Sequence, residues 1–211
     1  MILYVNGDSN SAGVEVWKPA LSWPHRLANR LGLTLVNDAK AGGSNPRILR
    51  TVGNFTSHTN LKDVFVIVGW TSWEREEWQK GNIYYDINGG GHDTLPPDLE
   101  LKYKTWVMDQ NQETRESKSQ AIHEHIHELH CHYKEKNVRH LFFNALMPFL
   151  HSGKHHDWHG NFLGPYDNDL SYYWYLKNHG YKPTKNNHYT DKAQQVWADV
   201  LYDYIQENKL L

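Results

Sequence analysis

The chain has 211 residues, 39% of them hydrophobic, and this size and composition predict one compact domain over 1–211. Its formal net charge of −2 leaves no extended basic surface, so we expect neither nucleic acid nor an anionic membrane as a partner. Cys131 is the single cysteine, which excludes an intrachain disulfide. The start of the sequence lacks a signal-peptide pattern, so we expect a cytoplasmic location in the producing cell.

Four short apolar runs predict the strands of a parallel sheet. They are rich in β-branched and aromatic residues, and two are continuous apolar stretches, which is typical of strands buried on both faces. The predicted strands cover residues 2–6, 33–37, 63–70 and 138–149.

Segments with helical spacing of apolar residues alternate with these strands. The first ends at Gly32 as a C-cap, the second opens at Asn45 with Pro46 in its first turn, and the last has Thr190 as N-cap. The alternation predicts an α/β fold, a three-layer αβα sandwich around a flavodoxin-like parallel sheet. The predicted helices cover residues 19–32, 45–55, 113–137, 168–180 and 190–208.

The segment from about residue 71 to 112 shows no such periodicity. It is rich in Gly, Asp, Asn and Pro, and we interpret it as a long loop excursion over the sheet. Loops of this length in compact domains are often functional.

Polar segments follow three of the strands and precede the last helix, and such strand ends meet at one edge of an open parallel sheet. Acyl transfer needs a nucleophile, a base and donors to the oxyanion. Ser9 follows the first strand and is the candidate nucleophile, and His188 is the candidate base. The backbone N–H groups of Ser9 and Gly42 are candidate oxyanion donors. Taken alone, Ser9 is equally typical of a helix N-cap.

Three motifs carry a resemblance to the SGNH (GDSL-type) hydrolase family. "GDSNSAG" is similar to the family's first block, "NDAKAGGSNPRI" (37–48) to its Gly block, and "HYTDKAQQVWADVL" (188–201) to the terminal block with the catalytic histidine. The order and spacing match as well. The chain as a whole resembles small stand-alone SGNH proteins of tailed bacteriophages. This resemblance implies the αβα fold, with Ser9 as nucleophile and His188 as base.

Two positions depart from the family's pattern. Thr71 stands where the family has an Asn that donates to the oxyanion, and a hydroxyl is shorter and can instead cap a turn. Asn186 stands near the place of the family's Asp, and it could orient the imidazole but not stabilise its charge. The remaining candidates to orient His188 are a backbone carbonyl or one of Asp167, Asp169 and Asp191.

The segment 113–137 also contains a histidine-rich motif. His123, Glu124 and His127 formally match H-E-x-x-H, a zinc-binding pattern. We expect these histidines to face solvent, because an apolar stripe turns the opposite side of the helix inward. That stripe consists of Ile122, Ile126 and Leu129. We therefore expect no metal and no cofactor, and a zinc hydrolase built on His123 and His127 stays an alternative.

The sequence thus predicts a serine esterase or deacylase acting on a small or carbohydrate-linked acyl ester. Polar, aromatic-rich loops favour a glycan ester over a long-chain lipid. The Ser9 and Gly42 N–H groups and the Thr71 side chain would hold the oxyanion, and Asn45, Trp70 and Arg75 would bind the substrate. The departures at Thr71 and Asn186 motivate an alternative, an SGNH-fold protein without catalysis that serves as a binding or structural module of a virus particle.

Overall fold

The computed structural model describes residues 1–92, 94–149 and 155–211. Its main sheet has five parallel strands in the order β2-β1-β3-β7-β8, which confirms the predicted parallel sheet. The central strand β3 is buried along its whole length, as its continuous apolar sequence indicated. The strands are β1 (Ile2–Asn6), β2 (Thr34–Asn37), β3 (Val64–Trp70), β7 (Arg139–Asn144) and β8 (Phe162–Leu163).

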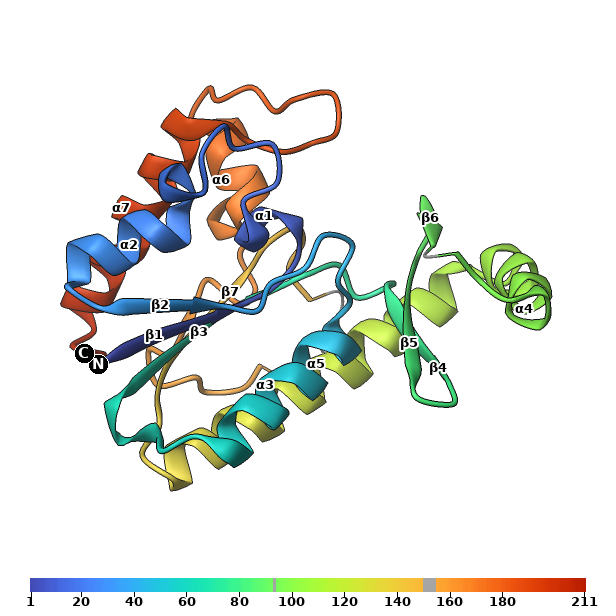
Figure 1. The fold of residues 1–211 in the computed structure, drawn as a ribbon, viewed down its shortest axis with the longest axis horizontal. Helices are drawn as coiled ribbons and strands as arrows, with labels where there is room; N and C mark the ends of the chain where they lie inside the picture. The colour runs from blue at the N-terminus through green and yellow to red at the C-terminus, as the bar shows by residue number, and fades with distance from the viewer. Residues whose placement is uncertain (93, 150–154) are drawn as a thin grey trace.

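Helices cover both faces of this sheet and make the predicted three-layer αβα sandwich (Figure 1). Alternate residues of β3 point to opposite layers: Phe65 packs in a cluster with Trp197, and Val66 packs in another with Ile126. The helices of the first layer are α2 (Trp23–Leu31), α6 (Tyr172–Asn178) and α7 (Asp191–Glu207). The helices of the second layer are α3 (Asn45–His58) and α5 (Gln112–Glu135).

Short helical turns complete the connections. They are α1 (Ser9–Ala12), η1 (Pro19–Leu21), η2 (Leu61–Asp63) and η3 (Asn168–Leu170). The helix predicted over 168–180 is therefore two elements, η3 and α6. Among the described residues, no helix combines the length and the apolar character needed to cross a lipid bilayer.

The three predicted helix boundaries are confirmed. Gly32 ends α2 in the left-handed conformation, with φ of 68°, and Thr190 precedes α7 as its N-cap residue. Asn45 is the first residue of α3, with Pro46 in its first turn, as predicted. Ser44 is the N-cap, and its hydroxyl accepts a hydrogen bond from the Arg47 backbone N–H at 3.3 Å.

The segment 71–112 is more regular than the expected loop excursion. It contains a three-stranded antiparallel sheet and a helix that project from the sandwich (Figure 1). The strands lack clear alternation, which hid them, but the pair Gly81-Asn82 is a recognised hairpin signal, and Gly81 has φ of 59°. These elements are β4 (Glu76–Lys80), β5 (Ile83–Asn88), β6 (Gly91–His92) and α4 (Pro97–Met108).

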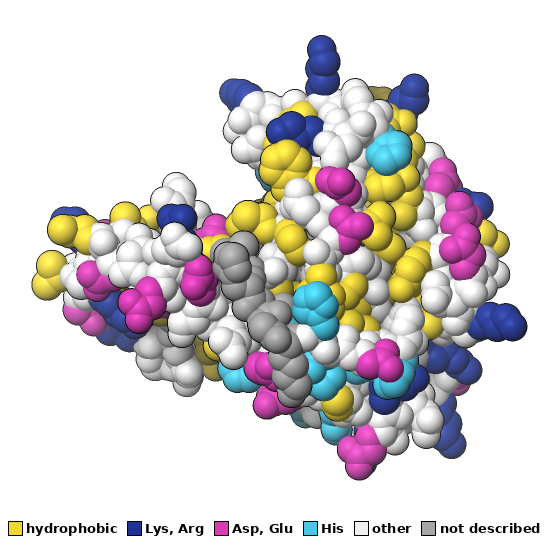
Figure 2. Space-filling model, turned by 180° about the vertical axis from the view of Figure 1, so that it is seen from behind, with side chains coloured by type: hydrophobic (Ala, Val, Ile, Leu, Met, Phe, Trp, Pro, Cys, Tyr) yellow, Lys and Arg dark blue, Asp and Glu magenta, His cyan; other side chains and the backbone are white. Residues whose placement is uncertain are grey.

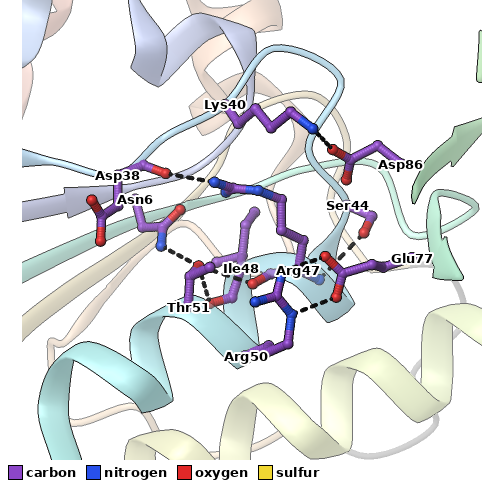
Figure 3. A network of polar contacts seen from close by, with 10 residues as sticks. All are labelled: Asn6, Asp38, Lys40, Ser44, Arg47, Ile48, Arg50, Thr51, Glu77 and Asp86. Atoms are coloured by element: carbon purple, nitrogen blue, oxygen red, sulfur yellow. Dashed lines mark hydrogen bonds and ion pairs between the residues drawn. The ribbon is translucent and has the colours of Figure 1, made fainter. Parts of the chain in front are cut away.

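Two ion pairs join this hairpin to the sandwich (Figure 3). Arg50 on α3 donates two hydrogen bonds to the Glu77 carboxylate on β4, at 2.8 and 2.6 Å. Lys40, on the loop after β2, contacts Asp86 on β5 at 2.6 Å. Since Lys40 belongs to the loop with the predicted Gly block, the hairpin is joined to a strand-end loop of the candidate site.

Candidate active site

Ser9 is the first residue of α1, directly after β1, and is not the N-cap of that helix. The N-cap residue of α1 is Asp8, whose carboxylate accepts a hydrogen bond from the Asn10 backbone N–H at 2.9 Å. Within the described part of the chain, the Ser9 hydroxyl has no hydrogen-bond partner. The sequence allowed the Ser9 hydroxyl to be either a helix cap or a nucleophile. Because it caps no helix and has no partner, it is available for chemistry.

The turn before Ser9 depends on glycine at position 7. Gly7 has φ of 155°, and a Cβ there would lie 2.5 Å from Ser11 Oγ and 2.9 Å from the Gly69 carbonyl oxygen. No side chain fits in this space, so glycine allows α1 to pack directly against the ends of β1 and β3. This close packing fixes Ser9 at the carboxyl edge of the sheet.

A pocket of about 360 Å³ contains Ser9 and His188, although 178 intervening residues separate them along the chain. Three of the four predicted strand-end and helix-start segments contribute to it. Gly42, of the fourth segment, does not line the pocket. The polar lining includes Ser9, Ser72, Glu74, Arg75, Asn186 and His188. The apolar and aromatic lining includes Leu146, Met147, Tyr173 and Trp174.

His188 is held by a tight turn just before α7. Its backbone N–H donates to Thr184 Oγ1 at 3.2 Å, and its carbonyl accepts from the Thr184 N–H at 2.7 Å. Asn187, directly before it, has φ of 62°, a conformation that is uncommon outside glycine. The imidazole Nδ1 lies 3.0 Å from Glu15 Oε2, so a carboxylate orients the ring and leaves Nε2 for another partner.

Glu15 is the partner of His188 that the sequence analysis missed. Thr184 and Asn186 donate hydrogen bonds to its carboxylate, and together with His188 they hold the pKa of Glu15 below its usual range. Its backbone has φ of 63°, in the turn that follows α1. No local pattern connects Glu15 with a histidine 173 positions away, so only the folded chain reveals the pair.

The residues predicted to orient His188 lie elsewhere. The Asn186 amide donates to Glu15 and makes no hydrogen bond to the imidazole among the described residues. Asp167 accepts from the Asp169 backbone N–H, and Asp169 accepts from the Asn178 side chain. Asp191 begins α7. Asn186 therefore supports the carboxylate that contacts His188 and does not contact the ring itself.

Thr71, the predicted oxyanion donor, uses its hydroxyl inside the protein. The side chain is buried, and Oγ1 donates to Asp8 Oδ2 at 2.9 Å. Asn45 binds both backbone groups of Thr71, accepting from its N–H at 2.9 Å and donating to its carbonyl at 3.0 Å. The Ser9 and Gly42 backbone N–H groups have no acceptor among the described residues, and of the two only Ser9 lines the pocket.

Arg75 is the one predicted substrate residue that lines the pocket. Its Nη1 lies 3.6 Å from Asp8 Oδ2 and donates to the Gly43 carbonyl at 3.3 Å. Asn45 and Trp70 are both buried and outside the pocket lining. Arg75 thus brings a positive charge to the mouth of the site, next to the loop that carries Gly42.

The expectation that the histidines of α5 face solvent was wrong for His123 and His130, whereas His125 and His132 are exposed. His123 and His130 are 0% and 1% exposed, because Trp158 and the chain around it pack over this side of the helix. Histidine side chains gather on one face of the molecule, mainly in the lower half of Figure 2. His123, Glu124 and His156 form a group with metal-ligating atoms close together, outside the pocket of Ser9.

The fold is similar to those of several solved esterases and lipases. Esterase EstA from Pseudoalteromonas sp. matches over 98% of this chain and 97% of its own, with a TM-score of 0.50 and 11% identity. The lipase Lip_vut3 from a goat rumen metagenome matches over 97% of both chains, with a TM-score of 0.51 and 13% identity. These matches confirm the fold that the SGNH resemblance implied.

A two-domain esterase, CEX, active on acetylated mannans, also shares the fold. It matches over all of this chain and 50% of its own length, with a TM-score of 0.52 and 11% identity. Nothing in these matches supports the expected likeness to bacteriophage proteins. No curated protein matches this sequence significantly.

The model of one sequence family matches residues 3–173, which include the five-stranded sheet, the projecting hairpin and the turn with Ser9 and Glu15. The match ends before the turn that carries His188. The chain therefore belongs to the family of unknown function DUF6071.

Proposed function

We propose that this protein is a serine esterase or deacylase with Ser9 as nucleophile, His188 as base and Glu15 as the carboxylate that orients His188. One observation carries the proposal. An unused serine hydroxyl and a histidine that is hydrogen-bonded to a carboxylate share one pocket at the carboxyl edge of the sheet. This is the arrangement that activates serine in unrelated hydrolases.

In the proposed reaction, Ser9 Oγ attacks the carbonyl carbon of an ester while His188 Nε2 takes the hydroxyl proton. The tetrahedral intermediate collapses, the bond to the alcohol oxygen breaks, and the leaving alcohol receives the proton from His188. A water molecule then attacks the acyl-enzyme with His188 again as base, which releases the acid and restores Ser9. The Glu15 carboxylate accepts a hydrogen bond from Nδ1–H and stabilises the imidazolium formed in each step.

The oxyanion of this intermediate needs donors that are already in position. The backbone N–H groups of Ser9 and Gly42 have no other acceptor in the described chain, and Ser9 also lines the pocket, so its N–H is the donor that the structure favours most. We assign the third contribution to the Arg75 guanidinium in place of the Thr71 hydroxyl, since Arg75 lines the pocket and Thr71 donates to Asp8. A fixed positive charge stabilises a developing oxyanion in a site shielded from water.

The substrate we propose is a small or carbohydrate-linked acyl ester. The pocket has room for a short acyl group, and Tyr173 and Trp174 offer flat aromatic faces beside Asn186 and Glu74. Aromatic faces combined with amide and carboxylate groups suit a sugar better than a long alkyl chain. The acetylated mannan esterase that shares the fold is consistent with this class.

The test is labelling with a serine-directed phosphonate, followed by mass spectrometry. We expect one label on Ser9, together with hydrolysis of a small acetyl ester, and loss of both in Ser9→Ala. Ser11→Ala is the matched control and should keep the label. Absence of both labelling and turnover in the folded protein would contradict the proposal.

A binding or structural role without catalysis is the second candidate, and the Thr71 hydroxyl favours it. Because that hydroxyl donates to Asp8, the site lacks the neutral third donor that the SGNH family uses. Loss of one such donor lowers kcat by roughly 10²–10³. A folded protein that binds a glycan ester but neither hydrolyses it nor takes the phosphonate would fit this role, including the expected virus-particle module.

A further inference from the structure

Helix α5 and the connection between β7 and β8 bring three potential metal ligands together. His123 and Glu124 lie on α5, and His156 lies on the connection. One ligating atom from each side chain lies within 4.8 Å of those of the other two. None of the three residues lines the pocket with Ser9 and His188, so this group serves no step of the proposed ester hydrolysis.

We propose that His123, Glu124 and His156 bind one divalent transition-metal ion of the zinc type. Two imidazole nitrogens and one carboxylate oxygen are ligands that Zn²⁺ prefers, with a water molecule able to complete a tetrahedron. Donor atoms around Zn²⁺ at bond lengths of ~2.1 Å lie about 3.4 Å apart. The group must therefore contract slightly, and the Glu124 side chain, 40% exposed, is free to rotate inward.

The buried ring of His123 supports the proposal most directly. His123 is 0% exposed, yet its Nδ1 has no hydrogen-bond partner among the described residues. An unpaired buried polar atom destabilises a fold, and a bound cation would remove that cost. The other ring nitrogen, Nε2, lies 2.9 Å from Tyr166 Oη, the kind of partner that orients a metal-bound imidazole.

His156 is held in place independently of any cation. Its Nε2 lies 3.2 Å from Glu124 Oε2, and its backbone N–H donates to Tyr166 Oη at 2.8 Å. Its ring stacks on His127 with centroids 3.6 Å apart and an interplanar angle of 5°. Ordering a ligand before binding lowers the entropic cost of binding, so these contacts favour a specific site over chance capture by surface histidines.

A cation here would connect two parts of the second layer. It would tie α5 to the connection between β7 and β8, which also carries Leu146 and Met147 of the ester pocket wall. We therefore assign the ion a structural role, that of joining α5 to the segment that carries His156. Half-buried His127 and exposed Cys131, with Nε2 and Sγ 3.6 Å apart, are the competing pair of ligands that the experiment must separate.

The experiment is calorimetric titration of the full chain with Zn²⁺, with Mg²⁺ for comparison and Co²⁺ as a spectroscopic probe. We expect one Zn²⁺ per chain, little affinity for Mg²⁺, and the visible absorption of Co²⁺ in a low-coordinate nitrogen and oxygen site. Glu124→Gln and His156→Asn should each weaken binding by about tenfold or more. His125→Asn, at an exposed position on the same helix, should leave it unchanged.

A thermal measurement adds a second readout. Zn²⁺ should raise the Tm of the wild-type chain and fail to raise that of folded His156→Asn, with circular dichroism verifying the fold of each variant. Either of two results overturns the proposal: no Zn²⁺ binding by the wild type, or equal affinity in wild type, Glu124→Gln and His156→Asn. A third result also overturns the proposal: the double variant His127→Asn/Cys131→Ser loses Zn²⁺ binding while His156→Asn keeps it. That result would assign the ion to His127 and Cys131.

Discussion

Glu15 is the residue that most changes the chemical interpretation of the pocket. A histidine base next to a neutral amide can take up a proton but gains no charge stabilisation, whereas Glu15 places a carboxylate 3.0 Å from Nδ1. Two other residues, Thr184 and Asn186, donate to the same carboxylate and keep it ionised. The left-handed backbone at Glu15 and Asn187 fits a site where the surrounding contacts hold unusual conformations.

Replacing this carboxylate by an amide tests its role. We expect Glu15→Gln to lower kcat for a small acetyl ester by about 10²–10⁴ with little change in KM, because the imidazolium loses its counter-charge only as it forms. Glu15→Asp should restore part of the activity. The measurement is steady-state kinetics on folded, purified variants.

Asp191→Asn is the matched control, since Asp191 was a sequence candidate for the same role but begins α7. Its kcat should stay within a few-fold of wild type. Equal kcat values in Glu15→Gln and wild type would show that Glu15 does not act through His188.

At the scale of elements, the β4–β5 hairpin depends on α3 for its position. The two hydrogen bonds between Arg50 and Glu77 match the planar guanidinium to the carboxylate, and the guanidinium also lies 4.0 Å above the Tyr84 ring. Glu77 is largely buried and Arg50 is about a third exposed. The ion pair is therefore intermediate between an exposed and a fully buried ion pair.

Breaking this pair should loosen the hairpin more than the sandwich. We expect Arg50→Ala to lower the free energy of unfolding by about 1–2 kcal/mol, since Glu77 is left buried and unpaired. Proteolysis within 76–92 should accelerate in the same variant. Urea unfolding and limited proteolysis measure the two effects.

The exposed pair Lys80 and Asp98 supplies the comparison. Lys80→Ala should change stability by no more than about 0.5 kcal/mol, because exposed ion pairs contribute little. If Arg50→Ala were as mild as Lys80→Ala in both measurements, the docking role of Arg50 would be wrong.

At the scale of the whole molecule, the interior contains a pair of neutral histidines. His140 Nδ1 donates to the Val138 carbonyl at 2.8 Å, so its Nε2 must accept the hydrogen of His130 Nδ1, 2.9 Å away. Burial lowers the pKa of His130 to about 3 and that of His140 to about 4. Neither ring can take up a proton without breaking this chain of contacts or carrying an unpaired charge into the core.

The protein should therefore lose stability in mild acid. In the unfolded chain these histidines titrate near pH 6.5, so the unfolded state binds more protons than the folded state as pH falls below that value. The stabilisation is complete above about pH 6.5 and decreases down to about pH 4. At pH 5 the free energy of unfolding should be lower than at pH 7.5 by about 2 kcal/mol for each of the two rings.

Urea unfolding of the wild-type chain at pH 7.5 and at pH 5 measures this loss. Both pH values lie above the range in which most carboxylates titrate. The exposed residue His132 provides the control, because His132→Gln should leave the pH dependence unchanged. An unfolding free energy that is the same at both pH values would contradict neutral burial of the pair.

The sequence alone determined the sandwich and named Ser9 and His188 as the candidates for its chemistry. Apolar runs and helical spacing are local patterns, so they predicted the parallel sheet and the helices, and the motif order identified Ser9 and His188. The hairpin at 76–92 was missed because its strands are polar or aromatic without alternation. Whether the site is active stays a prediction.

Only the tertiary structure decided which side chains meet. Glu15 reaches His188 across 173 positions, and Thr71 turns its hydroxyl to Asp8. On α5, His123 and His130 face a covering segment instead of solvent. Such pairings depend on where loops from different strands converge and on which element covers a helix face. Neither is encoded in the periodicity of a single segment, because packing between distant segments sets both.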